Sequence, residues 1–319
     1  MFGKLFTTSV QQGDRVFGVL RGRTDLSFIP DEFREDLGWL AFVAPKIITF
    51  GLIFILSFVM TIWISLHDYS LLAVEQPFIG LEHYITLAQD PVFRISVWNT
   101  ALYSAGMILI GVPISLGLAI LLNTGIRFSR VYSACIFLPV VTSWVVVSLI
   151  WLWLFNPDFG AINAILESVG LPTSAWLQST RTSLASITLM SIWKHVGFNM
   201  VIFLAGLQAI PSSYYEAARV DGAGRWAQFR YITLPLLRPT SFFVVVVTLI
   251  ATFQLFIQVF VMTGGGPVYS SHSIVFYFYI QGFDQFNMGY ASAMAVVLFV
   301  IVFALSIIQF RTWGEDVDY

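Results

Sequence analysis

Six long apolar segments dominate this chain of 319 residues. The hydrocarbon core of a bilayer is crossed by a helix of about 20 apolar residues. Backbone groups inside lipid must be satisfied within the segment, so apolar runs of this length predict α-helices. The chain is therefore expected to be an all-α membrane protein with six transmembrane helices. The expected spans are about 41–66, 100–122, 131–154, 184–209, 240–262 and 288–310.

The balance of charge supports a membrane protein and excludes several other classes. Charged residues make up 11% of the chain and hydrophobic residues 57%, whereas a soluble domain carries about 25% charge. A net charge of -2 predicts no nucleic-acid partner and leaves the lipid bilayer as the expected surroundings. A single cysteine excludes an intramolecular disulfide, and Cys135 is expected to be a small packing residue inside its apolar run.

Lysine and arginine set the expected orientation. Twelve of the sixteen lie in segments that are cytoplasmic if both termini are inside, and only Arg94 and Arg181 lie in outer loops. The positive-inside rule then predicts cytoplasmic N- and C-termini and a cytoplasmic loop 211–239. The first span begins too far into the chain for a secretory signal peptide and is expected to be retained.

The sequence divides into one membrane domain with short flanking segments. Residues 39–312 are expected to form the six-span domain, and residues 313–319 a cytoplasmic tail. Residues 1–38 form a cytoplasmic N-terminal segment that fits an interfacial amphipathic helix and an ordinary solvated lead-in equally well.

The loop after the fourth span carries a helix–turn–helix pattern. Ser213 stands three residues before Glu216, which predicts a capping box at the start of a helix over 214–221. Gly222-Ala223-Gly224 should end that helix, because glycine tolerates turn conformations that other residues resist. A second short helix is expected over about 225–232.

The residue pattern of this loop resembles the signature of binding-protein-dependent ABC importer permeases. The pattern runs Glu-Ala-Ala-x-x-Asp-Gly-Ala, followed by Phe229, Ile232 and Leu234-Pro235. In that family the loop, here 211–235, is a coupling helix seated in a groove of the cytoplasmic ATPase. The plainer alternative is a connector lying on the membrane, with Glu216 acting only as a cap. The resemblance assigns ATPase coupling to Glu216, Ala217, Ala218, Asp221, Gly222 and Ala223.

Other motifs narrow the resemblance to carbohydrate importers. This resemblance implies the type I importer permease fold and a place in the inner membrane. It also implies that the chain is the maltose-permease-like first permease of a pair. It also implies a second homologous permease, two ATP-binding cassette subunits that carry ATP and Mg²⁺, and an extracytoplasmic binding protein, with no cofactor on this chain. The motifs are Asn99-Thr100, Asn156-Pro157, Gly160, Asn163, Trp176-Leu177 and Thr263-Gly264-Gly265-Gly266-Pro267.

The sequence offers no energy-converting or catalytic site of its own. It has no G-x-x-x-x-G-K-[ST] phosphate loop, no H-E-x-x-H helix and no G-x-S-x-G elbow. The four histidines are spread over different segments. A non-catalytic translocation subunit is therefore expected, and an intramembrane enzyme is poorly supported.

Polar residues at membrane depth are expected to mark the substrate path, because burying them in lipid is costly. Lys194 lies about 10 residues into the fourth span, or roughly 15 Å along the helix. It fits either a functional site or a structural ion pair or hydrogen bond to the second permease. Thr248, Thr252 and Gln258 fall near one face of the fifth helix, and Gln254 lies about 100° around the helix from that face.

The family resemblance adds sugar contacts at positions matching His195, Phe198, Thr248, Ala251, Thr252 and Leu255. Helix packing is the alternative for each of these positions, especially for the threonines. The expected function is inward movement of a sugar or oligosaccharide. Glycerol 3-phosphate or a polyol remains open, as does an ion-coupled secondary transporter using Lys194 and His195. The predicted substrate pathway consists of Lys194, His195, Phe198, Asn199, Thr248, Thr252, Gln254 and Gln258.

Overall fold

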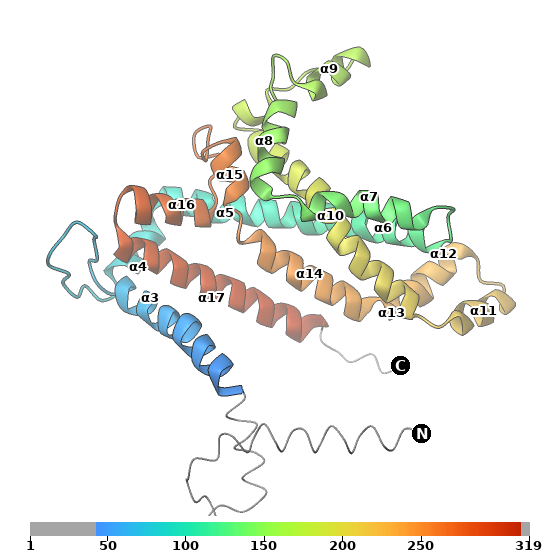
Figure 1. The fold of residues 1–319 in the computed structure, drawn as a ribbon, viewed down its shortest axis with the longest axis horizontal. Helices are drawn as coiled ribbons and strands as arrows, with labels where there is room; N and C mark the ends of the chain where they lie inside the picture. The colour runs from blue at the N-terminus through green and yellow to red at the C-terminus, as the bar shows by residue number, and fades with distance from the viewer. Residues whose placement is uncertain (1–42, 314–319) are drawn as a thin grey trace, which may run out of the picture. The chain divides into compact units, whose positions relative to one another are not determined.

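The computed structural model describes residues 43–313, so the N-terminal segment 1–38 and the tail from 314 lie outside the described residues (Figure 1). The chain divides into two compact units at Val59 and Met60. The described part of the first unit, 43–59, is one apolar helix that passes through a π-helical turn, η2 (Gly51–Leu56). It forms most of the first candidate span, Val43–Ser65, which ends with α3 (Ser57–Ser65).

The second unit is also helical, which confirms the expected fold class. Three of its helices are long and apolar enough to cross a membrane: Pro91–Asn123, α10 (Ser183–Ala209) and Met288–Thr312 within α17 (Met288–Trp313). The first of these is built from α5 (Pro91–Gly106), η3 (Met107–Gly111) and α6 (Val112–Asn123). Shorter elements are α4 (Glu82–Gln89), α9 (Ala161–Ser168), η4 (Trp176–Gln178), α11 (Ser212–Val220), α12 (Arg225–Gln228), η5 (Phe229–Thr233), α13 (Leu234–Leu236), α15 (Ile257–Met262), α16 (Ile274–Tyr279) and η6 (Ile280–Asp284).

The third span, expected over 131–154, is sharply bent. It consists of α7 (Ser129–Val141) and α8 (Trp144–Leu154), which meet at an angle of 98°. Pro139 lies inside α7 near its end. Proline lacks the N–H needed to continue the helical ladder, which favours a break shortly afterwards. Cys135 on α7 is exposed in this chain rather than packed as expected.

The fifth span, expected over 240–262, is bent just before its expected start and interrupted again within it. Residues Arg225–Leu236 meet α14 (Arg238–Thr252) at 64°. The chain then leaves the helix at Phe253 and resumes it in α15. Ser273 donates a hydrogen bond to the carbonyl oxygen of Leu255 inside this break. Irregular backbone at membrane depth requires such partners or a cavity beside it.

The second span begins at Pro91, nine residues before the expected start at 100, because Asp90 caps it. Asp90 Oδ1 accepts hydrogen bonds from the backbone N–H groups of Val92 (2.8 Å) and Phe93 (3.3 Å). Proline at the first helical position gives up no hydrogen bond. Asp90 Oδ2 accepts from the hydroxyls of Tyr277 and Tyr290, each at 2.7 Å, and so joins α5 to α16 and α17.

Asp90 should therefore make stability depend on pH at the acid end. Burial alone would raise the pKa of this carboxyl, but the two tyrosine hydroxyls and the two backbone N–H groups outweigh burial and lower the pKa below 3.8. A lowered pKa stabilises the folded state above the unfolded pKa, and this contribution is lost as pH falls through the folded pKa. Asp90→Ala is expected to cost ~1 kcal/mol or more at pH 7 through the lost cap alone.

Melting curves of the wild-type and Asp90→Ala proteins in detergent at pH 7, 5 and 3 measure this effect. The difference between the two melting temperatures should be largest at pH 7 and should shrink below pH 4. A difference that stays constant down to pH 3 would show that the ionised carboxylate contributes nothing.

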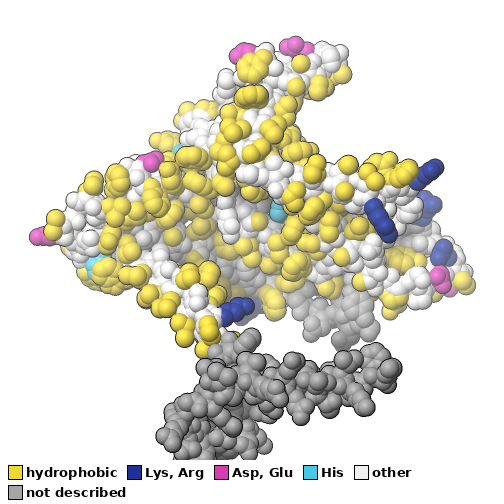
Figure 2. Space-filling view, in the orientation of Figure 1, with side chains coloured by type: hydrophobic (Ala, Val, Ile, Leu, Met, Phe, Trp, Pro, Cys, Tyr) yellow, Lys and Arg dark blue, Asp and Glu magenta, His cyan; other side chains and the backbone are white. Residues whose placement is uncertain are grey.

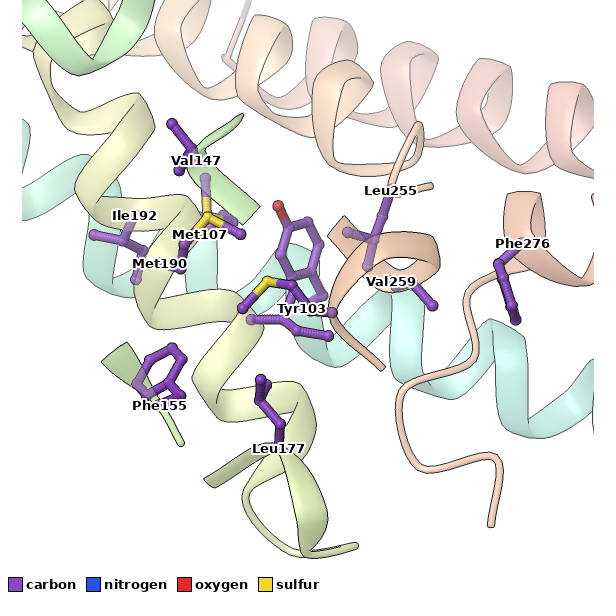
Figure 3. Close-up of a cluster of buried hydrophobic side chains, with 12 residues drawn as sticks. Tyr103, Met107, Val147, Phe155, Leu177, Met190, Ile192, Leu255, Val259 and Phe276 are labelled. Atoms are coloured by element: carbon purple, nitrogen blue, oxygen red, sulfur yellow. The ribbon is translucent and has the colours of Figure 1, made fainter. Parts of the chain in front are cut away.

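The core of the second unit surrounds α10, which lies beside α6 and α7 (Figure 1). One buried cluster joins α5, η3, α8, α10 and the segment 255–259. Figure 3 shows Tyr103 near the middle of the cluster, with Met107 and Met190 on one side of it and Leu255 and Val259 on the other. Two members of this cluster, Tyr103 and Met107, also line a cavity at the break of the fifth span.

Two asparagines of the motifs noted in the sequence, Asn99 and Asn163, hydrogen-bond to distant loop residues. Asn99 Nδ2 donates to the carbonyls of Tyr269 (2.9 Å) and His272 (3.0 Å), which fixes the glycine-rich loop 263–273 to the second span. Asn163 donates to the carbonyl of Ser174 (3.0 Å) and accepts from Trp176 Nε1 (2.8 Å). These asparagines therefore fix the conformations of the loops around 263–273 and 174–176.

Candidate transport cavity and coupling loop

A cavity of about 260 Å³ lies where the fifth span breaks. It is bounded by the second span, α8, α10, α14 and α15. Threonine and glutamine supply most of its hydrogen-bonding groups, while tryptophan and tyrosine supply aromatic surface. Its lining residues are Tyr103, Met107, Trp144, His195, Thr248, Ala251, Thr252, Gln254, Ile257 and Gln258.

Five residues of the predicted substrate pathway meet in this cavity: His195, Thr248, Thr252, Gln254 and Gln258. The shared helical face proposed for the fifth span is not what brings them together, because the helix ends at Thr252. The break turns Gln254 and Gln258 toward the same space that the threonines face. His195 Nε2 is buried without a hydrogen-bond partner among the described residues, which leaves it available to a ligand hydroxyl.

Other residues singled out from the sequence support the lining without joining it. The ring of Phe198 lies 5.4 Å from that of His195. Asn199 is buried and donates to Thr248 Oγ1 at 3.0 Å, which ties α10 to α14. Leu255 is buried in the core cluster beside the cavity.

Lys194 lies outside the lining and bonds to the bend in the third span. Its Nζ donates to the carbonyl oxygens of Pro139 (3.0 Å) and Val140 (3.1 Å). It also lies over the indole ring of Trp144, 4.5 Å from the ring centroid. The side chain is only 3% exposed. These partners belong to this chain, whereas the structural interpretation made from the sequence placed the partner on a second permease.

Sequence reasoning missed four lining residues: Tyr103, Met107, Trp144 and Ile257. For Trp144 a signal existed, because Pro139 followed by Thr142-Ser143 is a combination that ends helices. The other three are ordinary residues of apolar runs, and only the packing of several spans selects them.

The coupling loop ends its first helix in a Schellman motif. The N–H of Gly222 donates to the carbonyl of Arg219 (3.1 Å), and the N–H of Ala223 donates to that of Ala218 (2.8 Å). This pair of bonds requires a left-handed residue at the first position beyond the cap. Gly222 takes it with φ of 80°. The expected break at Gly222–Gly224 and the short helix after it are both present.

The capping box expected from Ser213 and Glu216 is absent from the loop. The helix begins at Ser212, with Pro211 at the cap position and no side-chain cap. Ser213 therefore lies inside the first turn, where its hydroxyl does not cap the helix. Instead, the hydroxyl of Tyr215 hydrogen-bonds with that of Thr233 at 3.0 Å and fixes α11 to η5.

The predicted coupling residues lie on the open side of this loop. Glu216, Ala217, Asp221 and Gly222 are exposed, and Ala218 and Ala223 are partly exposed. Figure 2 shows arginine side chains gathered at the end of this unit that carries the 124–130 turn and α11 to α13. The arginines of these segments are Arg127, Arg130, Arg219, Arg225 and Arg230.

Comparison with known proteins gives a consistent family. Residues 111–312 match the model of the "Binding-protein-dependent transport system inner membrane component" family. The probable ABC transporter permease protein YurN of Bacillus subtilis is 36% identical over 86% of this chain and 96% of that protein. The sn-glycerol-3-phosphate transport system permease protein UgpA of Yersinia pestis is 34% identical over 88% of this chain and 96% of that protein.

Solved structures agree with this result. The crystal structure of a bacterial alginate ABC transporter, in complex with an alginate-bound periplasmic protein, contains a chain that matches with a TM-score of 0.77 and 25% identity. The match covers 88% of this chain and 95% of that one. The resemblance inferred from the loop motif is confirmed: the chain belongs to the family of binding-protein-dependent transport system inner membrane components, the permeases of ABC importers.

Proposed function

We propose that this chain moves a sugar or oligosaccharide inward through the cavity at the break of the fifth span. One observation carries the choice of substrate class. Among the described residues, the cavity lining contains hydroxyl, amide, imidazole and aromatic groups but no aspartate, glutamate, lysine or arginine. Such a lining suits a neutral, polyhydroxylated solute, since each amide or hydroxyl can exchange hydrogen bonds with it.

Glycerol 3-phosphate is the second candidate, because the UgpA relatives are named for its transport. Its phosphate would need cationic partners in a site shielded from water. The ammonium nearest in sequence to the lining residue His195 is that of Lys194, which is bonded to Pro139 and Val140. The half of the path supplied by this chain therefore favours a sugar.

The same proposal assigns the energy source to partner proteins. Two ATP-binding cassette subunits, which carry ATP and Mg²⁺, would dock on loop 211–235 of this chain and on the matching loop of a second permease. An extracytoplasmic binding protein would deliver the sugar at the other side. The exposed face of α11 and the arginines around it support a cytoplasmic position for this loop.

Gln258→Leu tests the cavity directly. Gln258 is 7% exposed and lines the cavity, so the variant removes an amide with little change in volume. A lost neutral hydrogen bond of about 1 kcal/mol corresponds to roughly a fivefold rise in KM. ATP-driven uptake by the reconstituted importer, measured with a panel of sugars and with glycerol 3-phosphate, gives this value. The chain's α17 offers the matched control Gln309→Leu, which is expected to leave KM unchanged.

The two substrate classes give different results in this assay. Saturable sugar uptake with a raised KM in Gln258→Leu supports the proposal. Uptake of glycerol 3-phosphate in preference to every sugar tested would show that the substrate is a phosphate ester and not a sugar. An equal KM in the wild-type and Gln258→Leu proteins would show that the substrate path lies elsewhere.

A further inference from the structure

Lys194 supplies the cap that α7 needs where it ends. The last carbonyl groups of a helix have no partner within it, and leaving them unpaired in lipid is costly. The Lys194 ammonium bonds two of them: that of Val140, and that of Pro139, which also accepts from the N–H of Thr142 (3.3 Å). A positive charge at this end of a helix is also favoured by the helix dipole.

The same ammonium reaches the other side of the bend. Trp144 is the first residue of α8, and its ring lies 4.5 Å from Lys194 Nζ. An ammonium over an indole face is attracted to the ring, more strongly when both are withdrawn from water. Lys194 thus contacts the end of α7 and the start of α8 at once. Trp144 in turn lines the cavity, whereas Lys194 does not.

We propose that Lys194 is a positioning residue of the transport path: it fixes the bend of the third span and holds the Trp144 indole as an aromatic wall against which a sugar ring stacks. The stacking of a sugar ring on Trp144 rests on the proposed function, whereas the fixing of the bend and of the indole by Lys194 does not. Because Lys194 lies outside the cavity, it affects the substrate only through Trp144 and the bend. The neighbouring His195, which does line the cavity, is not required for this role.

Three substitutions separate the parts of this role. Lys194→Met keeps a long side chain but removes the ammonium and all of its donors. Lys194→Gln keeps a donor for a carbonyl but loses the charge over the indole. Lys194→Arg keeps the charge, the donors and the ability to stack on an aromatic ring, so it is the conservative variant expected to restore function.

The spectroscopic test does not depend on substrate. The complete importer is labelled with 5-fluorotryptophan, and the fluorine resonance that is missing from Trp144→Phe belongs to Trp144, one of ten tryptophans. Lys194→Met and Lys194→Gln are expected to shift or broaden this resonance, while Lys194→Arg keeps it near its wild-type position. Should Lys194→Met not assemble, Lys194→Gln carries the same prediction.

Sugar uptake by the same proteins tests the consequence. Lys194→Met and Lys194→Gln are expected to raise KM at least fivefold, and Lys194→Arg should stay within twofold of wild type. A Trp144 resonance that does not move when the ammonium is removed overturns the inference, whatever the uptake. A resonance that moves while KM stays at the wild-type value overturns the role of Trp144 as an aromatic wall for the sugar. An importer that takes up no sugar contradicts the proposed function alone, because the fluorine spectrum still tests the positioning.

Discussion

Replacement of Gly222 by valine is expected to reduce ATP-driven uptake by roughly ten- to hundredfold. Gly222 has φ of 80°, the left-handed position of the Schellman motif that ends α11. A β-branched residue resists this conformation at a cost of about 1–3 kcal/mol. The variant loop would therefore leave the conformation in which Glu216 to Ala223 form one exposed surface. We expect the ATPase to bind the permease more weakly as a result.

Two further variants isolate the backbone effect from any change in side chain. Gly222→Asn is expected to fall between wild type and valine, because asparagine visits the left-handed region more readily. Gly224 lies two residues away with φ of -71° and open space around its Cβ position. Gly224→Ala is therefore the matched control, and its uptake should stay within twofold of wild type.

The measurements are uptake, sugar binding to the external binding protein and co-purification of the ATPase subunits. Binding of sugar by the external protein should be unchanged in all variants. Wild-type uptake in Gly222→Val would contradict a coupling role for this loop. Equal losses in Gly222→Val and Gly224→Ala would show that the loop tolerates no change at all, and that left-handed strain is not the cause.

The sequence predicted those features that depend on local chemistry. Apolar length located the spans, and Gly222 marked the end of α11 because few other residues take its conformation. Five cavity residues were found because polar groups at membrane depth are costly unless they face protein or water. The breaks in the third and fifth spans were not found, although Pro139 and Thr142-Ser143 gave a signal for the first of them, because each bent pair of helices is still apolar enough to pass as one span.

The role of Lys194 shows why the remaining features required tertiary structure. From the sequence, an ammonium near mid-membrane fitted a functional site or a bond to another subunit. Its actual partners, the carbonyls of Pro139 and Val140, are more than 50 residues away. They lack the helical N–H four residues further on only because α7 ends at Val141. A site that depends on a break cannot be predicted before the break itself.

Gly197→Ala is expected to destabilise the protein through the same contact between α7 and α10. A Cβ atom at Gly197 would clash with the carbonyl oxygen of Ile136 and lie 3.0 Å from Phe137 Cα. These are backbone atoms of α7, so they cannot rotate away as a side chain would, and the two helices must separate. Overpacking of this kind costs about 1–3 kcal/mol. Lys194 is three residues earlier on the same face of α10, so separation would also weaken its bonds to Pro139 and Val140.

A fall in melting temperature of about 3–10 °C in detergent would correspond to this cost in a chain of this size. Gly117→Ala is the matched control, because Gly117 lies in α6 with nothing within 4 Å of its Cβ position. Alanine is a better helix former than glycine by up to about 1 kcal/mol, so the control should melt at or slightly above the wild-type temperature. If Gly197→Ala also melted there, α7 and α10 would not be in the close contact that the bend of the third span and the position of Lys194 both require.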